Sequence, residues 1–496
     1  MCRIDGYVDD KKIAECFKDT FSRVYSSGNC ANSDEKLRSA FLDAYTGYSQ
    51  LQFAGDLSNH LFSWVDMLSA LSKIQLGKAS SGLIKSQHIL MASPKLAIHL
   101  NILYNGLLQH SYVPVDFLRG VITPVVKDKD GDLSVTTNYR PVALSNIFAQ
   151  LLERLVLSKI EQFLYTDDLQ FGFKKKHSTS HAVLVLKSCT DYFLKHGSGT
   201  YVTFLDCSKA FDKILHHGIF LKLILRGVPF CFISLLVYWY SNMECVCKWN
   251  DAISTSFKIP TGVKQGGILS PHLFIIYVDD LLKRLRSRGV GCHVLNTFLG
   301  AILFADDLCL MAPTRRAMQI MLNICQKFCE EFGLQFNSKK SKMLVFGRRH
   351  ERLAKSVFLN GEPIETVSEW RYLGLFVQSG KSISFNPKHD LRNFYSSFNA
   401  LYNANTRPSE TVMMHLLYSI CIPNLTYAAD VKHLSASDMS QFNVAVNNAI
   451  RKIFSFNRWE SVRSFRAGLG YSDLYTIFAK RRSLFVKRLI TINNHV

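Results

Sequence analysis

The sequence predicts an α+β chain, because a stretch of alternating strands and helices lies between two mainly helical ends. At 496 residues the chain is long enough to bury more than one hydrophobic core, so we expect two to four domains. Apolar residues recur at helical spacing over residues 1–110 and again over 381–496, and β-rich runs alternate with helical runs over 111–380. We therefore expect a helical N-terminal extension, a central α+β region and a helical, basic C-terminal region.

Charge and cysteine usage narrow the class of protein. Lys and Arg outnumber Asp and Glu by 59 to 39, a net charge of +20 that favours a polyanionic partner such as nucleic acid. The 13 cysteines follow neither a disulfide nor a zinc-binding pattern, which favours reduced thiols in the nucleus and/or cytoplasm. The N-terminus lacks the apolar run of a signal peptide, and the most apolar stretch, 228–240, is too short to span a bilayer. We expect a protein that is not secreted and has no membrane span.

Residues 451–488 combine basic and aromatic side chains. Ten Lys or Arg occur there against two acidic residues, and the rings of Phe454, Phe456, Trp459 and Phe465 lie among them. Such a mixture is typical of a nucleic-acid surface, since cations contact phosphates and rings stack on bases. A solvated helix face explains the charges equally well, and the sequence does not separate the two interpretations.

Residues 121–144 predict a β-hairpin. Two β-rich runs flank Asp130–Gly131, a dipeptide typical of a tight turn. Lys127 and Arg140 then lie on opposite arms of the hairpin.

Three aspartates occur in a pattern that predicts a metal site. Asp306 and Asp307 interrupt the apolar segment 301–312, which predicts a strand-turn-strand hairpin with both at its tip, and Asp206 ends the apolar segment 201–205. Strands that deliver carboxylates to one sheet edge suit two Mg²⁺ ions about 3.5–4 Å apart, the arrangement used for phosphoryl transfer. We expect Asp206 and Asp306 to bridge the ions and Asp307 to support them. Taken alone, the adjacent pair is more often an ordinary Asp–Asp turn.

A glycine-rich segment, residues 261–274, lies between the first aspartate and the adjacent pair. Gly262, Gly266 and Gly267 let the backbone approach a substrate closely, and Gln265 offers an amide to a base or sugar. A glycine-rich segment by itself is weak evidence for a substrate-binding site. Its position in the sequence after Asp206 and before Asp306 makes that evidence stronger.

FLDCSKAFD, GVKQGGILSPHLF and LFADD, in this order, resemble motifs A, B and C of reverse transcriptases. More specifically, the chain resembles the polymerase part of non-LTR (LINE-type) retrotransposons, jockey-like in its motifs. Further similarities are Lys127 with NYRPVAL of the fingers, QFGFKKKHSTSHAV after them, GLQFNSKKSKML of motif D and WRYLGLFV of motif E. The ordered similarities cover residues 120–380.

The resemblance implies a right-hand polymerase with fingers, a palm of antiparallel sheet plus helices, and a helical thumb. It implies RNA-directed DNA synthesis by two-metal phosphoryl transfer to a primer 3′-OH, with Mg²⁺ as cofactor and Mn²⁺ as a substitute. The partners implied are dNTPs, an RNA template and a DNA primer or target, as in target-primed reverse transcription. No endonuclease domain fits before residue 110, and we find no RNase H or protease signature.

The catalytic carboxylates that bind the metal ions correspond to Asp206, Asp306 and Asp307. Lys340 corresponds to a motif D lysine that protonates the pyrophosphate leaving group, with Lys339 or Lys342 as alternatives.

The resemblance also assigns substrate contacts. Lys127 and Arg140 correspond to the cationic clamp on the triphosphate, and Phe211 to a steric gate against a ribose 2′-hydroxyl. The template contact corresponds to Gln265 and Gly266. The primer grip corresponds to Trp370, Tyr372, Leu373 and Gly374.

Two other functions remain open. An intron maturase or a viral RNA-dependent RNA polymerase has the same architecture, but Phe211 argues against RNA synthesis and the motifs argue against a maturase. A catalytically inactive or domesticated reverse-transcriptase-like nucleic-acid-binding protein is the other. The intact aspartates weigh against it, whereas residues 425–435 lack a Trp that the family usually has shortly after Tyr427, which indicates thumb decay.

The sequence contains a second Asp–Asp pair, in Tyr277–Asp280. It spells YVDD, the pattern that many viral reverse transcriptases have at motif C. The surrounding segment has apolar residues at helical spacing and ends in a basic, glycine-terminated turn. A catalytic hairpin tip needs strands on both sides, so we reject this pair as the active site.

Overall fold

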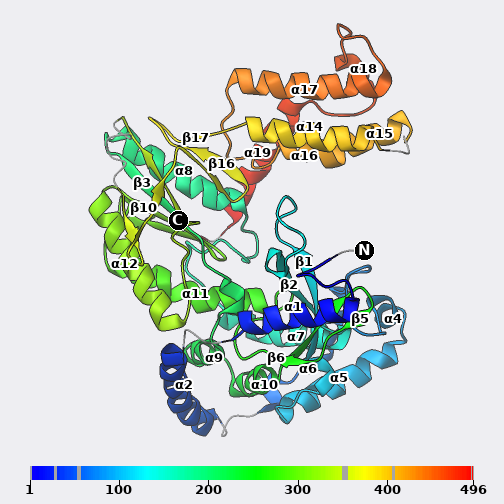
Figure 1. Cartoon of the computed structure of the whole chain (residues 1–496), viewed down its shortest axis with the longest axis vertical. Coiled ribbons are helices and arrows are strands. Elements are labelled where there is room, and N and C mark those ends of the chain that lie inside the picture. Colours follow the sequence, from blue (N-terminus) through cyan, green and yellow to red (C-terminus); the bar gives the residue numbers. More distant parts are fainter. Residues whose placement is uncertain are drawn as a thin grey trace. The chain divides into compact units, whose positions relative to one another are not determined.

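The computed structural model describes residues 3–26, 31–52, 57–348, 356–404, 408–492, 494 and 496. The chain forms two compact units, each assembled from separate stretches of sequence. The first unit consists of Met1–Asp167, Cys207–Arg284 and Ile324–Phe336, and the second of Asp168–Asp206, Leu285–Asn323 and Asn337–Val496. Helices and sheets occur in both units (Figure 1), so the predicted α+β class is confirmed.

The N-terminal part of the first unit is helical. Its elements are α1 (Asp10–Val24), α2 (Ala31–Gln52), η1 (Leu57–His60), α3 (Trp64–Ser72), α4 (Ser86–Leu90), α5 (Pro94–Gln109) and α6 (Val115–Leu118). The local sequence explains where these helices begin. Asp9 caps α1 by accepting a hydrogen bond from the Lys12 amide (2.9 Å), Ser63 forms a capping box at the start of α3, and Pro94 occupies the first position of α5.

The predicted hairpin of the first unit is present, but its turn is longer than predicted. Strands β1 (Arg119–Val126) and β2 (Tyr139–Leu144) pair antiparallel. Residues 127–138 connect them and include the 3-10 turn η2 (Thr136–Asn138). The Asn138 side-chain amide donates to the Asp128 carbonyl (2.8 Å), and such side-chain bonds replace the strand ladder here. Asp130–Gly131 therefore lies within a long loop, and the prediction of a two-residue turn was wrong.

The remaining elements of the first unit extend this sheet and cover it. Strand β4 (Glu244–Trp249) runs parallel to β1, and the short strands β5 (Ala252–Ile253) and β6 (Phe257–Lys258) pair with β4. The other elements are α7 (Ile147–Ile160), η3 (Glu161–Phe163), η4 (Ala210–Asp212), α9 (His216–Leu225), α10 (Phe230–Ser241) and most of α11 (Ser270–Ser287). Helix α2 packs on α9 and α3 packs on α7.

A five-stranded sheet, which we call the central sheet, organises the second unit. Its strand order is β14 (Glu365–Thr366), β11 (Lys342–Phe346), β3 (Thr200–Leu205), β10 (Asp307–Ala312) and β9 (Ala301–Phe304). Every residue of β3 is buried, as expected for the middle strand of a covered sheet. Helix α8 (Thr179–Lys195) packs against β3 and β9, and α12 (Arg315–Phe332) follows β10 in the chain.

The rest of the second unit consists of small sheets followed by helices. The small sheets are β7 (His293–Val294) with β8 (Thr297–Phe298), β12 (Phe358–Leu359) with β13 (Glu362–Pro363), and β15 (Glu369–Tyr372) with β16 (Leu375–Gln378) and β17 (Ser384–Phe385). The helices are α14 (Lys388–Tyr402), α15 (Glu410–Leu416), the π-helical turn η5 (Leu417–Cys421), α16 (Ile422–Leu425), α17 (Ala436–Phe454), α18 (Arg463–Gly468) and α19 (Leu474–Thr491).

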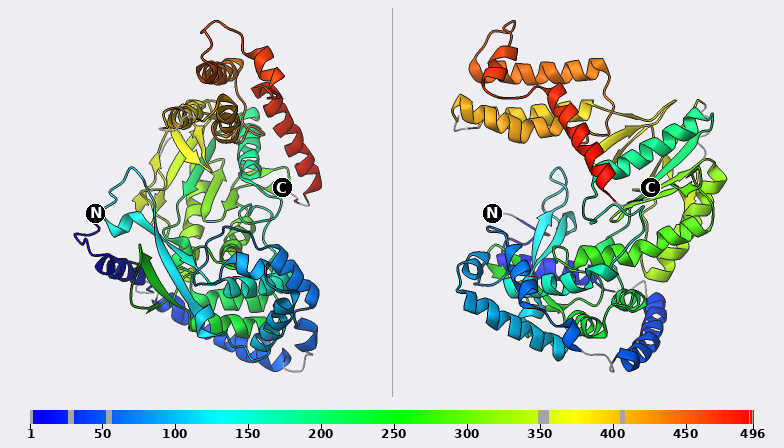
Figure 2. Two further views of the ribbon diagram at one scale, coloured as in Figure 1. Left: turned by 90° about the vertical axis from the view of Figure 1, so that its right-hand side faces the viewer. Right: turned by 180° about the vertical axis from the view of Figure 1, so that it is seen from behind.

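The C-terminal helices have a hydrophobic core of their own. Phe394, Met414, Leu425 and Phe442 are almost completely buried in it. Helix α19 lies beside α8 (Figure 2), where the ring of Phe485 contacts that of His181 with centroids 4.9 Å apart. Within the part of the chain that the structure describes, no helix is long and apolar enough to cross a membrane.

Candidate active site

Asp306 and Asp307 lie at the tip of a tight hairpin, which we call the catalytic hairpin (β9, its turn and β10). β9 ends at Phe304 and β10 begins directly opposite it at Asp307, so the turn consists of Ala305 and Asp306. Ala305 adopts the left-handed conformation (φ 59°) that two-residue hairpin turns use. The strand-turn-strand arrangement predicted for this segment is therefore confirmed.

Asp206 reaches the same edge of the central sheet from the neighbouring strand. It directly follows β3, in which Leu205 lies opposite Leu308 of β10. Continuing that register places Asp206 beside Asp307 rather than beside Asp306. The Asp206 backbone is held on both sides, because its amide donates to Ser341 Oγ (3.3 Å) and its carbonyl accepts from the Asn337 amide (2.9 Å).

The electrostatics of the three carboxylates indicate a site for cations. Burial, together with the charges of Asp306 and Asp206, raises the pKa of Asp307 to about 6, although part of the residue remains open to solvent. Burial also raises the pKa of Asp206. Three hard oxygen donors that repel one another fit Mg²⁺. Among the described residues, however, no three His, Cys, Asp or Glu side chains already converge as a complete metal-ligand set.

The contacts of the motif D lysines distinguish between the three candidates. The Lys340 ammonium lowers the pKa of Asp206, which opposes the effect of burial. Lys342 forms an ion pair with Glu365 (2.6 Å) and donates to the Lys339 carbonyl (2.7 Å), so its ammonium is already engaged. Neither Lys339 nor Lys342 contributes to the pKa shifts of Asp206 and Asp307. This arrangement favours Lys340.

Gln170 and Gly172 support the catalytic hairpin, and the sequence assigned them no role. The buried Gln170 Oε1 accepts hydrogen bonds from the amides of Ala305 (3.2 Å) and Gly172 (2.9 Å). The Phe171 amide donates to the Leu303 carbonyl (2.8 Å), which adds a backbone contact beside β9. A side chain at position 172 would lie 2.9 Å from the Phe304 carbonyl carbon and closer still to the Ala305 nitrogen. The QFGF segment resembles the family, but its contacts with the catalytic hairpin are evident only from the fold.

The predicted primer grip is the tight turn between β15 and β16. Tyr372 lies opposite Leu375, and the turn residues Leu373 (φ 45°) and Gly374 (φ 83°) are both left-handed. Tyr427 Oη donates to the Leu373 carbonyl (2.8 Å), and a Cβ on Gly374 would lie 3.0 Å from the Tyr427 ring. The tyrosine of the divergent segment 425–435 is thus in contact with this turn.

Tyr372 joins the primer-grip turn to the central sheet. Its ring packs on Phe204 of β3, with centroids 4.8 Å apart. Burial raises the pKa of the Tyr372 hydroxyl, and the charges of Cys309 and Asp307 add to that shift. Trp370, opposite Val377, is partly exposed on the same hairpin.

The predicted triphosphate clamp belongs to the first unit. Arg140 is exposed on β2 opposite Val125, and Lys127 lies two residues beyond Val125, so both residues belong to one face of the hairpin. Lys127 Nζ donates to the Thr137 carbonyl (2.9 Å), which holds the ammonium over the loop. The two cations are therefore close in the strand register although 13 residues separate them in the sequence.

The predicted gate and template contacts also lie in the first unit. The Phe211 ring stacks on Phe274, with centroids 4.4 Å apart and planes 10° apart. The Gln265 carbonyl accepts from the Ala143 amide (2.8 Å), and Gly266 (φ 109°) approaches β2 so closely that a Cβ would lie 2.8 Å from the Ala143 carbonyl. The glycine at 266 is therefore required by both its conformation and its contact.

Asp212 is a second residue that the sequence did not single out. Its carboxylate accepts a hydrogen bond from Gln265 Nε2 (2.6 Å), which fixes which end of the Gln265 amide lies against Asp212. Asp212 is almost completely buried, and this burial raises its pKa to about 6. The only sequence signal was its place at the end of motif A, in AFD.

The rejected YVDD pair lies in the middle of helix α11. Asp279 is fully buried, pairs with Arg226 (3.3 Å) and Lys283 (3.4 Å), and accepts from the Asp167 amide (2.7 Å). Asp280 pairs with Lys222 and with Lys283 (3.1 Å). The predicted helix is confirmed, and both carboxylates are occupied by structural ion pairs.

Several arginines of the basic C-terminal region have structural roles. Four of its arginines bond within the fold, as when Arg481 donates to the Thr426 carbonyl (2.8 Å) and Arg482 to that of Ala429 (3.3 Å). Others remain exposed, and Arg458 adjoins Trp459, whose side chain is 83% exposed. Internal bonding thus accounts for some of the charges, and a nucleic-acid surface remains a prediction for the rest.

Comparison with known proteins identifies the family. Residues 126–377, half of the chain, match the family described as reverse transcriptase (RNA-dependent DNA polymerase). The Pol polyprotein of the type-2 retrotransposable element R2DM of Drosophila melanogaster is 27% identical over 332 residues, which are 65% of this chain and 30% of that protein. The RNA-directed DNA polymerase of the mobile element jockey of Drosophila funebris is 25% identical over 397 residues, 77% of this chain and 43% of that protein.

This chain thus spans less than half the length of these two relatives. Among solved structures, a telomerase from Candida albicans aligns with 71% of this chain and 63% of its own, at 12% identity and a TM-score of 0.38. The matched residues 126–377 include all three aspartates at the edge of the central sheet. The chain belongs to the reverse transcriptase family, and its relatives are enzymes of non-LTR retrotransposons, as the order of its motifs predicted.

Proposed function

We propose that the chain is an RNA-directed DNA polymerase of a non-LTR retrotransposon, which adds dNTPs to a primer 3′-OH. The observation that carries the proposal is the group of carboxylates at one edge of the central sheet, with Asp206 and Asp307 in register and Asp306 in the adjoining turn. Phosphoryl transfer depends mainly on positioning and on neutralising negative charge, and such a group supplies the required ligands.

Mg²⁺ would be held by Asp206, Asp306 and Asp307, and Mn²⁺ can substitute. When bound, the metal supplies charge neutralisation for the triphosphate and lowers the pKa of the attacking hydroxyl. The raised pKa of Asp307 supports this assignment, since carboxylates that repel one another gain most from a shared cation. In this proposal Lys340 delivers a proton to the leaving pyrophosphate, and its electrostatic effect on Asp206 supports that role.

The remaining residues bind the substrates. Lys127 and Arg140 hold the triphosphate by charge-assisted hydrogen bonds. Phe211 excludes the ribose 2′-hydroxyl, and its stack on Phe274 keeps the ring in a fixed orientation. The template contact is made by Gln265 and Gly266. The primer end is held by Trp370, Tyr372, Leu373 and Gly374.

In this proposal residues 1–110 are an N-terminal extension, 111–380 the fingers and palm, and 381–496 a helical, basic thumb. The RNA template and a DNA primer or target are the partners, and we include priming by a nicked target end in the proposal because the motifs resemble those of non-LTR retrotransposons. The reaction would occur in the nucleus and/or cytoplasm.

A primer-extension assay on an RNA template tests the function. The wild-type chain should extend a DNA primer with dNTPs in the presence of Mg²⁺, and dNTPs should be strongly preferred over NTPs offered side by side. Asp306→Asn should abolish extension while salt-sensitive RNA binding persists, because the substitution removes one charge and leaves the fold intact. Phe211→Val should admit NTPs, since it removes the bulk of the gate.

The main alternative, a protein that binds nucleic acid without catalysis, predicts RNA binding and no extension by the wild-type chain under any metal. Preferential incorporation of NTPs by the wild type would instead indicate an RNA polymerase. Extension that survives Asp306→Asn would refute the assignment of the site.

A further inference from the structure

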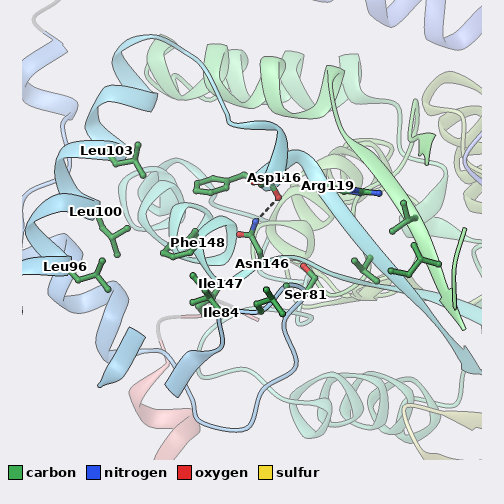
Figure 3. A pocket seen from close by; sticks show the side chains of 16 residues that line it. Ser81, Ile84, Leu96, Leu100, Leu103, Asp116, Arg119, Asn146, Ile147 and Phe148 are labelled. Atoms are coloured by element: carbon green, nitrogen blue, oxygen red, sulfur yellow. Dashed lines mark hydrogen bonds between the residues drawn. The ribbon is translucent and has the colours of Figure 1, made fainter. Parts of the chain in front are cut away.

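The first unit contains an apolar groove formed by α5, β1, the start of α7 and the segment before α4. Its larger part is a pocket of about 720 Å³ (Figure 3). One wall is helix α5, which contributes Leu96, Leu100 and Leu103, and the opposite wall is the start of α7, with Ile147 and Phe148. The pocket is thus lined mainly by aliphatic side chains, and none of the predicted polymerase residues contributes to it.

A second, smaller pocket of about 190 Å³ continues the groove along α5. It shares Leu96 and Leu100 with the larger pocket, and its other side is formed by Trp64 and Leu68 of α3 and by Leu90. Two pockets joined along one helix make an elongated site. Such a shape suits a linear segment with several apolar anchors better than a compact small molecule.

The groove exposes apolar surface that soluble proteins usually cover. Leu83 is 93% exposed at its edge, and Leu68 and Leu103 are 46% and 43% exposed. Continuous apolar patches of this kind mark interaction sites. The feature therefore calls for a partner.

The charges around the groove indicate the chemistry of that partner. Residues 67–115, which include most of the lining, contain four lysines and no Asp or Glu. Lys85 follows Ile84 and Lys95 precedes Leu96, and both lysines are exposed. Arg119 lies at the polar end of the larger pocket (Figure 3), and its guanidinium forms no ion pair within the described ranges of the chain. One carboxylate, that of Asp116, lies at the same end.

We propose that this groove binds an amphipathic helical segment of another polypeptide, with apolar anchors at spacings of three and four residues and acidic residues beside them. The anchors fill the two pockets on either side of Leu96 and Leu100, and the acidic residues meet Lys85, Lys95 and Arg119. Single-stranded nucleic acid fits less well, since its bases stack on exposed aromatic rings, whereas most of the lining is aliphatic and only Trp64, Phe117 and Phe148 are aromatic among the described lining residues. The inference is independent of the polymerase function.

Binding of a designed peptide tests the proposal. The probe is a fluorescein-labelled helix of about 18 residues, with Leu at positions i, i+3, i+4 and i+7 and Glu on both flanks. Fluorescence anisotropy with the full chain should show saturable binding at roughly micromolar concentrations. A peptide of the same composition with scrambled order should bind about tenfold or more weakly, because its apolar residues no longer share a face.

Matched variants locate the site. Leu103→Glu and Leu83→Glu should each weaken binding about tenfold, whereas Ile102→Glu, a neighbour on α5 that does not line the groove, should change it less than about twofold. All three residues are substantially exposed, at 43%, 93% and 65%, so the fold should persist. Lys85→Glu combined with Lys95→Glu should weaken binding severalfold at low salt, whereas Lys11→Glu on α1 should not.

Three results would overturn the proposal. The first is that peptide binding does not saturate up to about 1 mM peptide. The second is that Leu103→Glu and Ile102→Glu weaken binding equally. The third is that a single-stranded RNA oligonucleotide displaces the peptide and that Leu103→Glu weakens the binding of this RNA. Primer extension on a short template should be unchanged by the groove variants, so failure of this proposal is distinguishable from failure of the polymerase assignment.

Discussion

Replacing Gly172 by alanine should slow catalysis by displacing the catalytic turn. The added Cβ would lie 2.9 Å from the Phe304 carbonyl carbon and 3.0 Å from the Ala305 Cα, whereas ordinary contacts begin at 3.4 Å. The turn must therefore move by roughly 0.5–1 Å, and a displacement near 1 Å can cost about 100-fold in rate. Gly172 has no left-handed conformation that would forbid alanine, so the effect isolates the contact.

Single-turnover primer extension measures this effect directly. For Gly172→Ala we expect kcat to fall about 100-fold, with a loss of stability of about 1–3 kcal/mol from overpacking and little change in RNA affinity. Gly468→Ala is the matched control, since nothing lies within 4 Å of its added Cβ. A folded Gly172→Ala protein with kcat within about twofold of the wild type would refute the reasoning that this contact sets the position of Asp306.

The remaining predictions concern buried carboxylates. Asp279→Asn breaks the buried pair with Arg226 and should lower the free energy of unfolding by about 3 kcal/mol, as measured by denaturant titration. Activity per folded molecule should stay the same. Loss of activity without loss of stability would contradict a structural role for Asp279. Asp212→Ala removes the acceptor that holds the Gln265 amide and should raise the KM for dNTPs about tenfold, with a smaller change in kcat. A double substitution with Gln265→Ala should then add little further loss. Because the pKa of Asp307 is raised to about 6, protons compete with Mg²⁺ below that pH, and the Mg²⁺ concentration for half-maximal activity should rise as the pH falls through it. In metal-free protein the raised pKa means that ionisation of Asp307 lowers the stability of the fold as the pH rises from about 4 to about 6. Added Mg²⁺ should restore the melting temperature. If neither the Mg²⁺ requirement nor the melting temperature changed with pH, the result would argue against a metal site shared by the aspartates.

The local sequence pattern was sufficient to predict those elements whose residues all lie within one short segment. The catalytic hairpin was predictable because apolar runs on both sides of Asp306 and Asp307 can only pair across a tight turn. The helical position of Asp279 followed from apolar spacing in the same way. The fingers hairpin was predictable as two strands, but its turn was not, because Asn138 hydrogen bonds draw residues 127–138 into a long loop.

Contacts between segments that are far apart in the chain could not be predicted from local sequence patterns. The register of β3 and β10 places Asp206 beside Asp307, and the proposal that Asp206 and Asp306 bridge the metal ions stays a prediction. Lys340 was distinguished from Lys342 by its effect on the pKa of Asp206 and by the ion pair of Lys342 with Glu365. Likewise, several arginines of the C-terminal region proved to hold backbone carbonyls together, a role that charge counting cannot distinguish from nucleic-acid binding.

The family and the order of the motifs could be predicted from the amino-acid sequence, as could the three aspartates that we propose as catalytic, because each motif is a run of adjacent residues with recognisable chemistry and periodicity. The fold was needed to show which aspartate lies beside Asp206 in the strand register, that Gln170 and Gly172 contact the turn at Ala305, and where apolar surface is exposed. These contacts and exposed surfaces depend on strand register and on packing between residues far apart in the chain, and neither of these can be inferred from local composition.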